Sequence, residues 1–300
     1  VYCYQAFGLG IHSEFALFDL PVQEVTQDVA IVEDKIDITI EEQTSYPYIK
    51  LSPQEVIFLI KDVGRFRISH GCQIVVDPDI TAEQGEVQRY LVGPAMVFLL
   101  YQRNHLVLHA SAVSIYGQGV AFLGDSGAGK SSIAAAFLAQ GHKLVVDDIA
   151  AVKMNSSHAW LNPGFPYIKL SHEAKEIIAL NPEQLEFMDF VDDKVSWHLS
   201  HLAHNERVPL RHIYIIQPGE KIGIERFNSQ QALFELMRFS IPVRMVRMNH
   251  VAHFEHCVKL LKHVQVFGLM RPQSLTQLFR LVNLVEENMS QMEQSSKQGR

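Results

Sequence analysis

A glycine-rich segment near the middle of the chain contains the residue types needed to hold a phosphate group. Residues 124–131 read GDSGAGKS and match the pattern G-x-x-x-x-G-K-S in full. Its three glycines let the backbone turn tightly and bring N–H groups toward phosphate oxygens. Lys130 is expected to reach the β- and γ-phosphates, and the Ser131 hydroxyl to ligate Mg²⁺. The expected nucleotide-binding residues are Gly124, Asp125, Ser126, Gly127, Ala128, Gly129, Lys130, Ser131 and Ser132.

The stretches on either side of this loop also fit a phosphate site. An apolar strand is expected at residues 120–123 and an alanine-rich helix at residues 130–140, ended by Gly141. The positive N-terminal end of that helix would face a bound phosphate. A glycine-rich turn without a ligand is the alternative, but strand, loop and helix all lie in register with the motif. No Asn/Thr-Lys-x-Asp stretch that would recognise guanine is present, so ATP is the expected nucleotide.

Two consecutive acids follow the next apolar run. Asp147 and Asp148 come directly after an expected strand at residues 144–146, 17 and 18 residues beyond Lys130. Two acids beside a phosphate loop allow two roles. One can hold the metal or its water, while the other accepts a proton from an attacking hydroxyl. A helix cap or a solvated turn is the alternative for this pair.

One histidine lies upstream of the loop on a strand that leads toward it. His109 directly follows the apolar residues 106–108 and precedes Gly124 by 15 residues. It could hydrogen-bond a carboxylate or a phosphate oxygen. A satisfied core histidine is an equally good interpretation of this residue alone.

Taken together, LHAS at residues 108–111, GDSGAGKS and LVVDD at residues 144–148 resemble the catalytic domain of HPr kinase/phosphorylase and its relatives. The resemblance implies an α/β fold, with a P-loop kinase domain of the HPr kinase type and a β-rich N-terminal domain. It also implies ATP and Mg²⁺, with His109, Lys130, Asp147 and Asp148 as catalytic residues. By this resemblance, Ser131 binds the metal with Asp147 as the supporting acid, and Asp148 is the proton acceptor.

The chain departs from that family after the paired acids. A glycine-rich segment of the LEIRGxG type is replaced here by NPGFPYIKL at residues 162–170. This stretch, with YQAFGL at residues 4–9, looks more like the HPr-kinase-like proteins encoded with lasso-peptide genes. Those relatives phosphorylate a serine on a precursor peptide, so the implied partner is a peptide or protein carrying a serine. The alternatives are an HPr kinase/phosphorylase acting on a carrier protein and a nucleotide-switched binding protein. A homo-oligomer stays possible.

Length and composition limit the domain number, the class of partner and the cellular setting. The 300 residues suggest two domains, residues 1–100 and residues 101–300, the first serving substrate recognition. The formal charge of -7 argues against a nucleic-acid partner. The most apolar run, residues 91–101, is too short to cross a membrane, and no signal peptide opens the chain. Three widely spaced cysteines favour a reduced, cytoplasmic setting.

The N-terminal hundred residues are expected to be mostly strands and turns. Alternation predicts a strand at residues 36–40, and a hairpin is expected at residues 66–76. A helical pattern over residues 81–102 begins at a Thr81 cap, with Gln84 as its capping-box partner, and breaks at Gly93-Pro94.

The C-terminal part is expected to contain helices at residues 229–239, 249–263 and 274–289, with a frayed tail at residues 290–300. Two histidine triplets at i, i+3, i+6 spacing are interpreted as polar helix surface rather than zinc sites. A stripe of Val251, Phe254, Val258 and Leu261 is interpreted as core. Charged residues at positions 192–194, 207 and 211 either line the substrate side or form surface ion pairs. The histidine triplets are His198, His201 and His204, and His250, His253 and His256.

Overall fold

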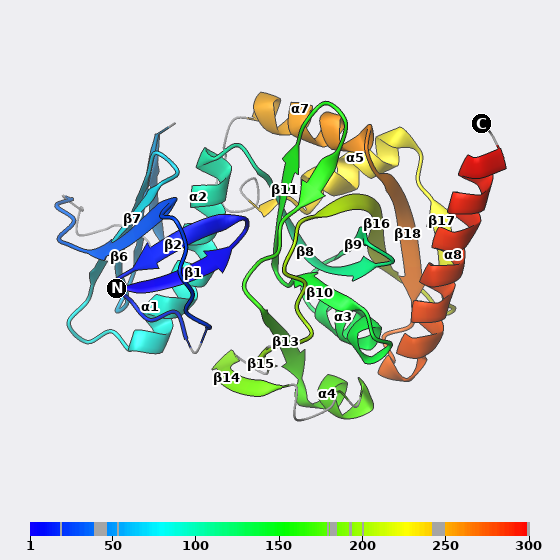
Figure 1. Ribbon diagram of the computed structural model, residues 1–300, viewed down its shortest axis with the longest axis horizontal. Coiled ribbons are helices and arrows are strands. Elements are labelled where there is room, and N and C mark those ends of the chain that lie inside the picture. Colours follow the sequence, from blue (N-terminus) through cyan, green and yellow to red (C-terminus); the bar gives the residue numbers. More distant parts are fainter. Residues whose placement is uncertain are drawn as a thin grey trace.

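The computed structural model describes residues 1–18, 20–38, 47–52, 54–178, 180, 185–191, 194–199, 201–241 and 250–298. Figure 1 shows two large sheets that lie side by side, with helix α2 (Met96–Gln102) between them. The predicted α/β fold with a β-rich N-terminal region is confirmed. None of the described helices is long and apolar enough to cross a membrane.

The N-terminal sheet contains seven strands in the order β1-β2-β3-β7-β6-β5-β4. The predicted hairpin is confirmed as β6 and β7. The predicted strand at residues 36–40 is wrong for residues 36–38, because the Ile36 N–H is bound by the Asp77 side chain, 3.2 Å away, instead of by a neighbouring strand. Residues 39 and 40 lie outside the described residues. The strands are β1 Tyr2–Ala6, β2 Leu9–Ser13, β3 Val29–Glu33, β4 Tyr48–Leu51, β5 Glu55–Ile60, β6 Gly64–Ser69 and β7 Gln73–Pro78.

A broken helix connects the two sheets. It consists of α1 (Gln84–Tyr90), a wide turn at Leu91–Ala95 and α2, and the predicted break is confirmed by the non-helical backbone of Gly93. The predicted cap at Thr81 is wrong, since the helix begins after Glu83 without a side-chain cap. Helix α2 is apolar all round because it packs against both β6 and β8 (Leu106–Ile115).

The second sheet is built around the long strand β8, which continues beyond the apolar residues 106–108 as far as Ile115. Strands β10 and β11 both pair with β8. The register shifts by one residue between Leu144 and Val146, and it then runs on from Val146 opposite Ala112 to Ile149 opposite His109. Strand β9 lies between β8 and β16 and is parallel to β16. The strands are β9 Gln118–Leu123, β10 Lys143–Val146, β11 Ile149–Met154, β12 Ala159–Leu161, β16 Val208–Pro218, β17 Gly223–Arg226 and β18 Gln265–Arg271.

Helices cover both faces of this sheet (Figure 1). Helix α3 (Lys130–Ala139) ends before Gly141, whose positive φ of 89° confirms the predicted stop. Helices α5 (Ser229–Arg238) and α7 (His250–Leu261) pack together. The C-terminal helix α8 (Leu278–Gln298) follows a short turn at Leu275–Gln277 and contacts α3. The predicted frayed tail is therefore wrong up to residue 298.

A small third sheet has the strand order β13-β15-β14. Helix α4 (His172–Ile178) begins directly after β13. Its strands are β13 Tyr167–Ser171, β14 Glu186–Val191 and β15 Lys194–His198. The expectation of a helix carrying the first histidine triplet is wrong, because His198 ends β15 and His201 lies in a turn. The predicted core stripe on α7 is wrong for Val251 and Phe254, which are 68% and 44% exposed, whereas Leu261 is half-buried and packs against the core.

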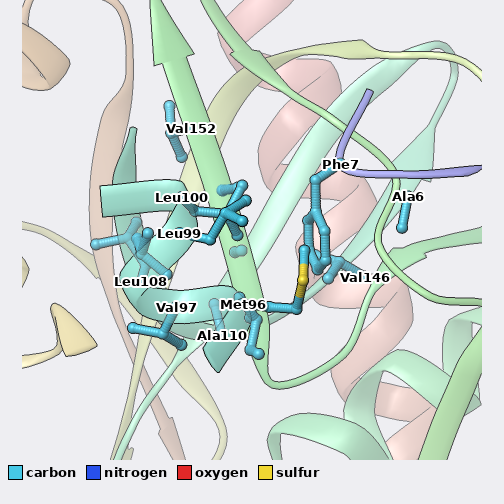
Figure 2. Close-up of a cluster of buried hydrophobic side chains, with 14 of the residues drawn as sticks. Ala6, Phe7, Met96, Val97, Leu99, Leu100, Leu108, Ala110, Val146 and Val152 are labelled. Carbon is cyan, nitrogen blue, oxygen red and sulfur yellow. The ribbon is translucent and has the colours of Figure 1, made fainter. Parts of the chain in front are cut away.

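The hydrophobic core is continuous across the first two sheets. One cluster contains residues of the N-terminal sheet, of α2 and of β8, β10 and β11. Figure 2 shows the ring of Phe7, from the turn between β1 and β2, beside Met96 and Val146 in this core. Because the two sheets share one core, the predicted division of the chain into residues 1–100 and 101–300 stays a proposal about the roles of the two parts. A second cluster fills the opposite face of the second sheet, under α3 and α8.

Candidate active site

The expected phosphate-binding residues form the loop between β9 and α3 and the first turn of that helix. Gly127 and Gly129 have φ of 80° and 95°, a region that glycine enters without a steric penalty. A Cβ atom on Gly124 would lie 3.0 Å from the Cβ of Ala128. Because α3 begins at Lys130, the N–H groups of its first turn have no carbonyl partner within the helix. These groups are the donors that a phosphate would use.

The Lys130 side chain folds back over the loop. It is buried, and its Nζ donates to the carbonyl oxygens of Gly124 and Asp125, at 3.0 and 3.2 Å. These contacts keep the ammonium group inside the loop. The charge is thus held where the motif places the β- and γ-phosphates.

Two arginines from distant parts of the chain also reach the loop. Arg271, buried at the end of β18, donates to the carbonyl of Ala128 at 3.4 Å and to that of Pro272 at 2.8 Å. Arg238, at the end of α5, forms an ion pair with Asp125 at 2.6 Å. No motif in the sequence identifies either residue, because more than a hundred positions separate each from the loop.

Asp147 is a buried carboxylate that faces the loop. Its Oδ1 accepts from the Ser131 hydroxyl at 3.0 Å and from the Ser111 hydroxyl, and its Oδ2 accepts from the Lys169 N–H at 3.0 Å. Burial, together with the neighbouring charge of Asp148, raises the pKa of Asp147. A cation beside this carboxylate would relieve both effects.

The Ser131 and Asp147 pair fits a magnesium ion. Neighbouring ligands of an octahedral Mg²⁺, each about 2.0–2.1 Å from the metal, lie about 2.9 Å apart. The observed separation of the Ser131 and Asp147 oxygens is 3.0 Å. In the part of the chain that the structure describes, no three His, Cys, Asp or Glu side chains form a group that could hold a metal. Two protein ligands suit Mg²⁺, which keeps waters and substrate phosphates for its other positions.

Asp148 has a different environment from its neighbour. Its φ of 68° lies in the left-handed region, and its side chain is 28% exposed. One oxygen lies 3.7 Å from His109 Nε2 and the other 2.7 Å from Lys169 Nζ. Burial raises the pKa of Asp148, but the hydrogen bond from His109 and the charge of Lys169 outweigh burial and hold that pKa below its usual value. Asp148 is therefore ionised at neutral pH.

Sheet pairing explains how these residues meet. Asp147 and Asp148 occupy the junction between β10 and β11, beside residues 110 and 111 of β8. Ser111 therefore reaches Asp147, and His109 reaches Asp148. The His109 N–H also donates to the carbonyl of Phe239 at 2.9 Å, just after α5. The structure thus brings together the histidine, the loop and both acids.

Lys169 is a further site residue that sequence reasoning missed. It lies on β13, and it contacts both aspartates, one through its N–H and the other through its ammonium group. Burial favours the neutral amine, but Tyr167 and Asp148 outweigh burial and raise the pKa of Lys169. In the sequence, Lys169 lies within the PGFPYIKL stretch at residues 163–170, to which sequence reasoning assigned no catalytic role. Residues 192 and 193 lie outside the described residues.

Known proteins resemble this chain over the residues that form the candidate site. The family model described as HPr Serine kinase C-terminal domain matches residues 102–169. An HPr kinase/phosphorylase from Chlorobium phaeovibrioides is 45% identical over 56 residues, which are 19% of this chain and 16% of the relative. One from Lachnoclostridium phytofermentans is 41% identical over 46 residues, 15% of each chain. One from Treponema pallidum is 36% identical over 59 residues, 20% of this chain and 18% of the relative.

A solved structure, the Hpr(Ser) kinase/phosphatase from Coxiella burnetii, matches with 14% identity and a TM-score of 0.36. The match covers 64% of this chain and 96% of that one. Against the curated relatives, the chain spans less than a fifth of their length.

Fold and site together define a class of protein, in which a strand, a glycine-rich loop and a helix lie beside paired acids. Within that class, residues 102–169 are similar to the HPr Serine kinase C-terminal domain.

Proposed function

We propose that this protein is an ATP-dependent kinase that transfers the γ-phosphoryl group to a serine hydroxyl of a peptide or protein. The observation that supports it is the division of labour between the two acids. Asp147 is buried against Ser131 of the phosphate loop, and Asp148 is partly exposed between His109 and Lys169. One carboxylate suits a metal and the other an incoming hydroxyl.

The loop residues would bind and orient the nucleotide. The N–H groups at the start of α3 and the ammonium of Lys130 face the phosphate position. Arg271 adds a buried positive charge next to Ala128. Ser131 and Asp147 would hold Mg²⁺, which when bound neutralises charge on the β- and γ-phosphates.

Asp148 would orient the acceptor hydroxyl and take its proton. Its low pKa makes it a weak base but keeps it charged. A weak base is sufficient here, because phosphoryl transfer passes through a loose transition state in which positioning and charge matter most. His109 and Lys169 hold the carboxylate in place from two sides.

The finer substrate assignment rests on resemblance. A serine in a short precursor peptide, of the lasso type, is the first candidate. The names of the curated relatives favour the second, a kinase/phosphorylase acting on a carrier protein. The three cysteines are unpaired in the structure, which suits the reducing cytoplasm that we propose. A homo-oligomer is also compatible with this proposal.

The test follows the γ-phosphate of labelled ATP. The full chain, with Mg²⁺, is incubated with a serine-bearing precursor peptide or with an HPr carrier protein. We expect label on serine of one acceptor, and none when the acceptor serine is replaced by alanine. The Lys130→Ala variant serves as the inactive control. Label released only to water, with either acceptor, would overturn the kinase assignment and favour a nucleotide-switched binding protein.

A further inference from the structure

A cavity of about 920 Å³ lies outside the phosphate loop, where the N-terminal sheet meets the second sheet. Its walls are β1, the segment that follows residue 20, residues 162–166 and residues 203–207. The volume is at the upper end of the range for small-molecule pockets, about 300–1,000 Å³. It is much larger than a phosphate or a single carboxylate requires.

The charge of this cavity is opposite to that of the whole chain. Arg103, Lys153 and Arg207 line it, and none of its described lining residues is an aspartate or a glutamate. The chain as a whole carries a formal charge of -7. Three histidines, His70, His105 and His204, also line the cavity. The positive charges of the two arginines and the lysine favour a ligand with several negative groups.

An unpartnered buried polar atom also marks the cavity as a binding site. His105 is 4% exposed, and its Nδ1 has no hydrogen-bond partner among the described residues. Burial and the positive charge of Lys153 lower the pKa of His105 to about 4. The imidazole is therefore neutral at pH 7, and its Nδ1 is a buried polar atom that a polar group of a ligand could pair with.

The cavity also contains a free stretch of strand edge. Strand β1 is the edge strand of its sheet, and its outward-facing groups include the Cys3 carbonyl and the Phe7 N–H. Cys3 accepts from Gln23, and Phe7 donates to Pro163. Since outward and inward groups alternate along an antiparallel pair, the N–H and C=O of Gln5 point outward between those two contacts. Gln5 is exposed and lines the cavity, so an extended peptide can pair with it.

The cavity lies within a short reach of the catalytic acids. Pro166 lines it, and three residues further along the same segment Lys169 contacts Asp148. Three residues of chain span at most about 11 Å. A peptide held in the cavity can therefore place a residue a few positions away beside Asp148.

We propose that this cavity binds a carboxylate-rich segment of the peptide or protein substrate, which pairs with the edge of β1 and directs a nearby serine to Asp148. This inference rests on the proposed kinase function. The recognition step itself needs no nucleotide, so it can be tested separately.

The binding test uses the full chain without ATP and a fluorescein-labelled hexaglutamate peptide, followed by anisotropy. Lys153→Glu and Arg207→Glu reverse two exposed charges of the cavity, and Lys61→Glu makes the same change at an exposed lysine outside it. We expect the double variant to raise the Kd about tenfold and the control to leave it within about twofold. Gln5→Pro removes the outward N–H, and we expect it to weaken binding more than Gln5→Ala does.

Competition separates the ligand sources. Free glutamate and inorganic phosphate should displace the peptide only at concentrations far above that of unlabelled hexaglutamate. Displacement by phosphate at an equal concentration would assign the cavity to a small anion and overturn the proposal. Absence of hexaglutamate binding, or an equal loss in Lys61→Glu, would overturn it too. A fluorescent ATP analogue, tested with Lys130→Ala, reports on the proposed function independently.

Discussion

Replacing Asp148 and Asp147 one at a time by asparagine separates the two roles that their environments suggest. Asparagine keeps the size of the side chain and removes its charge and basicity. At position 148 the amide would lie between two donors, His109 and the Lys169 ammonium. At position 147 it would face the Ser131 hydroxyl and the Lys169 N–H.

The Asp148→Asn variant should lose turnover while it retains the nucleotide. Loss of a general base typically lowers kcat about 10²–10⁴-fold, which corresponds to about 2.7–5.5 kcal/mol of transition-state stabilisation. ATP affinity should change little, because Asp148 contacts His109 and Lys169 rather than the phosphate loop.

The Asp147→Asn variant should instead change the metal requirement. Asp147 is 4% exposed, and its Oδ1 lies 3.0 Å from the Ser131 oxygen, so the amide removes the charged member of the metal pair. Altering groups that hold a metal commonly weakens affinity about 10–100-fold. We expect a rise of that size in the Mg²⁺ concentration that gives half-maximal rate.

The assay is a Mg²⁺ titration of phosphate transfer from labelled ATP for both variants and the native chain. Basal hydrolysis provides a readout that needs no peptide. Circular dichroism of each variant checks that it is folded. Near-normal kcat in Asp148→Asn, with Asp147→Asn inactive at every Mg²⁺ concentration, would show that the proton acceptor is the other aspartate.

Three further substitutions test the phosphate loop, the environment of Asp148 and the hydrophobic core. Lys130→Ala should abolish phosphoryl transfer while the protein stays folded, and wild-type turnover in the purified variant would contradict the site. Lys169→Met removes a charge that lowers the pKa of Asp148, so that pKa should rise and the acid limb of the rate-pH profile should move to higher pH. The control Lys194→Met should leave the limb unchanged. An unchanged limb in Lys169→Met would refute the coupling between Lys169 and Asp148. Phe7→Ala should lower the free energy of unfolding by about 3–5 kcal/mol in a urea titration, because a buried ring is deleted, whereas Tyr2→Ala at an exposed site should cost under about 1 kcal/mol.

Sequence reasoning succeeded where the structure depends on neighbouring residues. The loop between β9 and α3 follows from three glycines, a lysine and a serine within eight positions. The helix stop at Gly141 and the break at Gly93 are likewise local, because single residues set those backbone angles. Local periodicity was less reliable on α7. The spacing identified an apolar stripe, but His253, Cys257 and Leu260 are the buried residues.

The reason for that error is a tertiary contact. The Ser240 hydroxyl lies 2.7 Å from His253 Nε2, so a buried hydrogen bond offsets the cost of burying the imidazole. Hydrophobic pattern alone counts a histidine as surface. The face of a helix that is buried thus depends on the partner that covers it.

The phosphate loop, the paired acids and the resemblance over residues 102–169 could be read from the sequence, because each is a run of residues whose chemistry depends on immediate neighbours. Three other features depend on the folded chain: Lys169 contacts both acids, Arg271 and Arg238 reach the loop, and a cationic cavity opens beside β1. These contacts join residues far apart in the chain. Strand register and packing create them, and spacing along the sequence carries no record of which distant strands will pair.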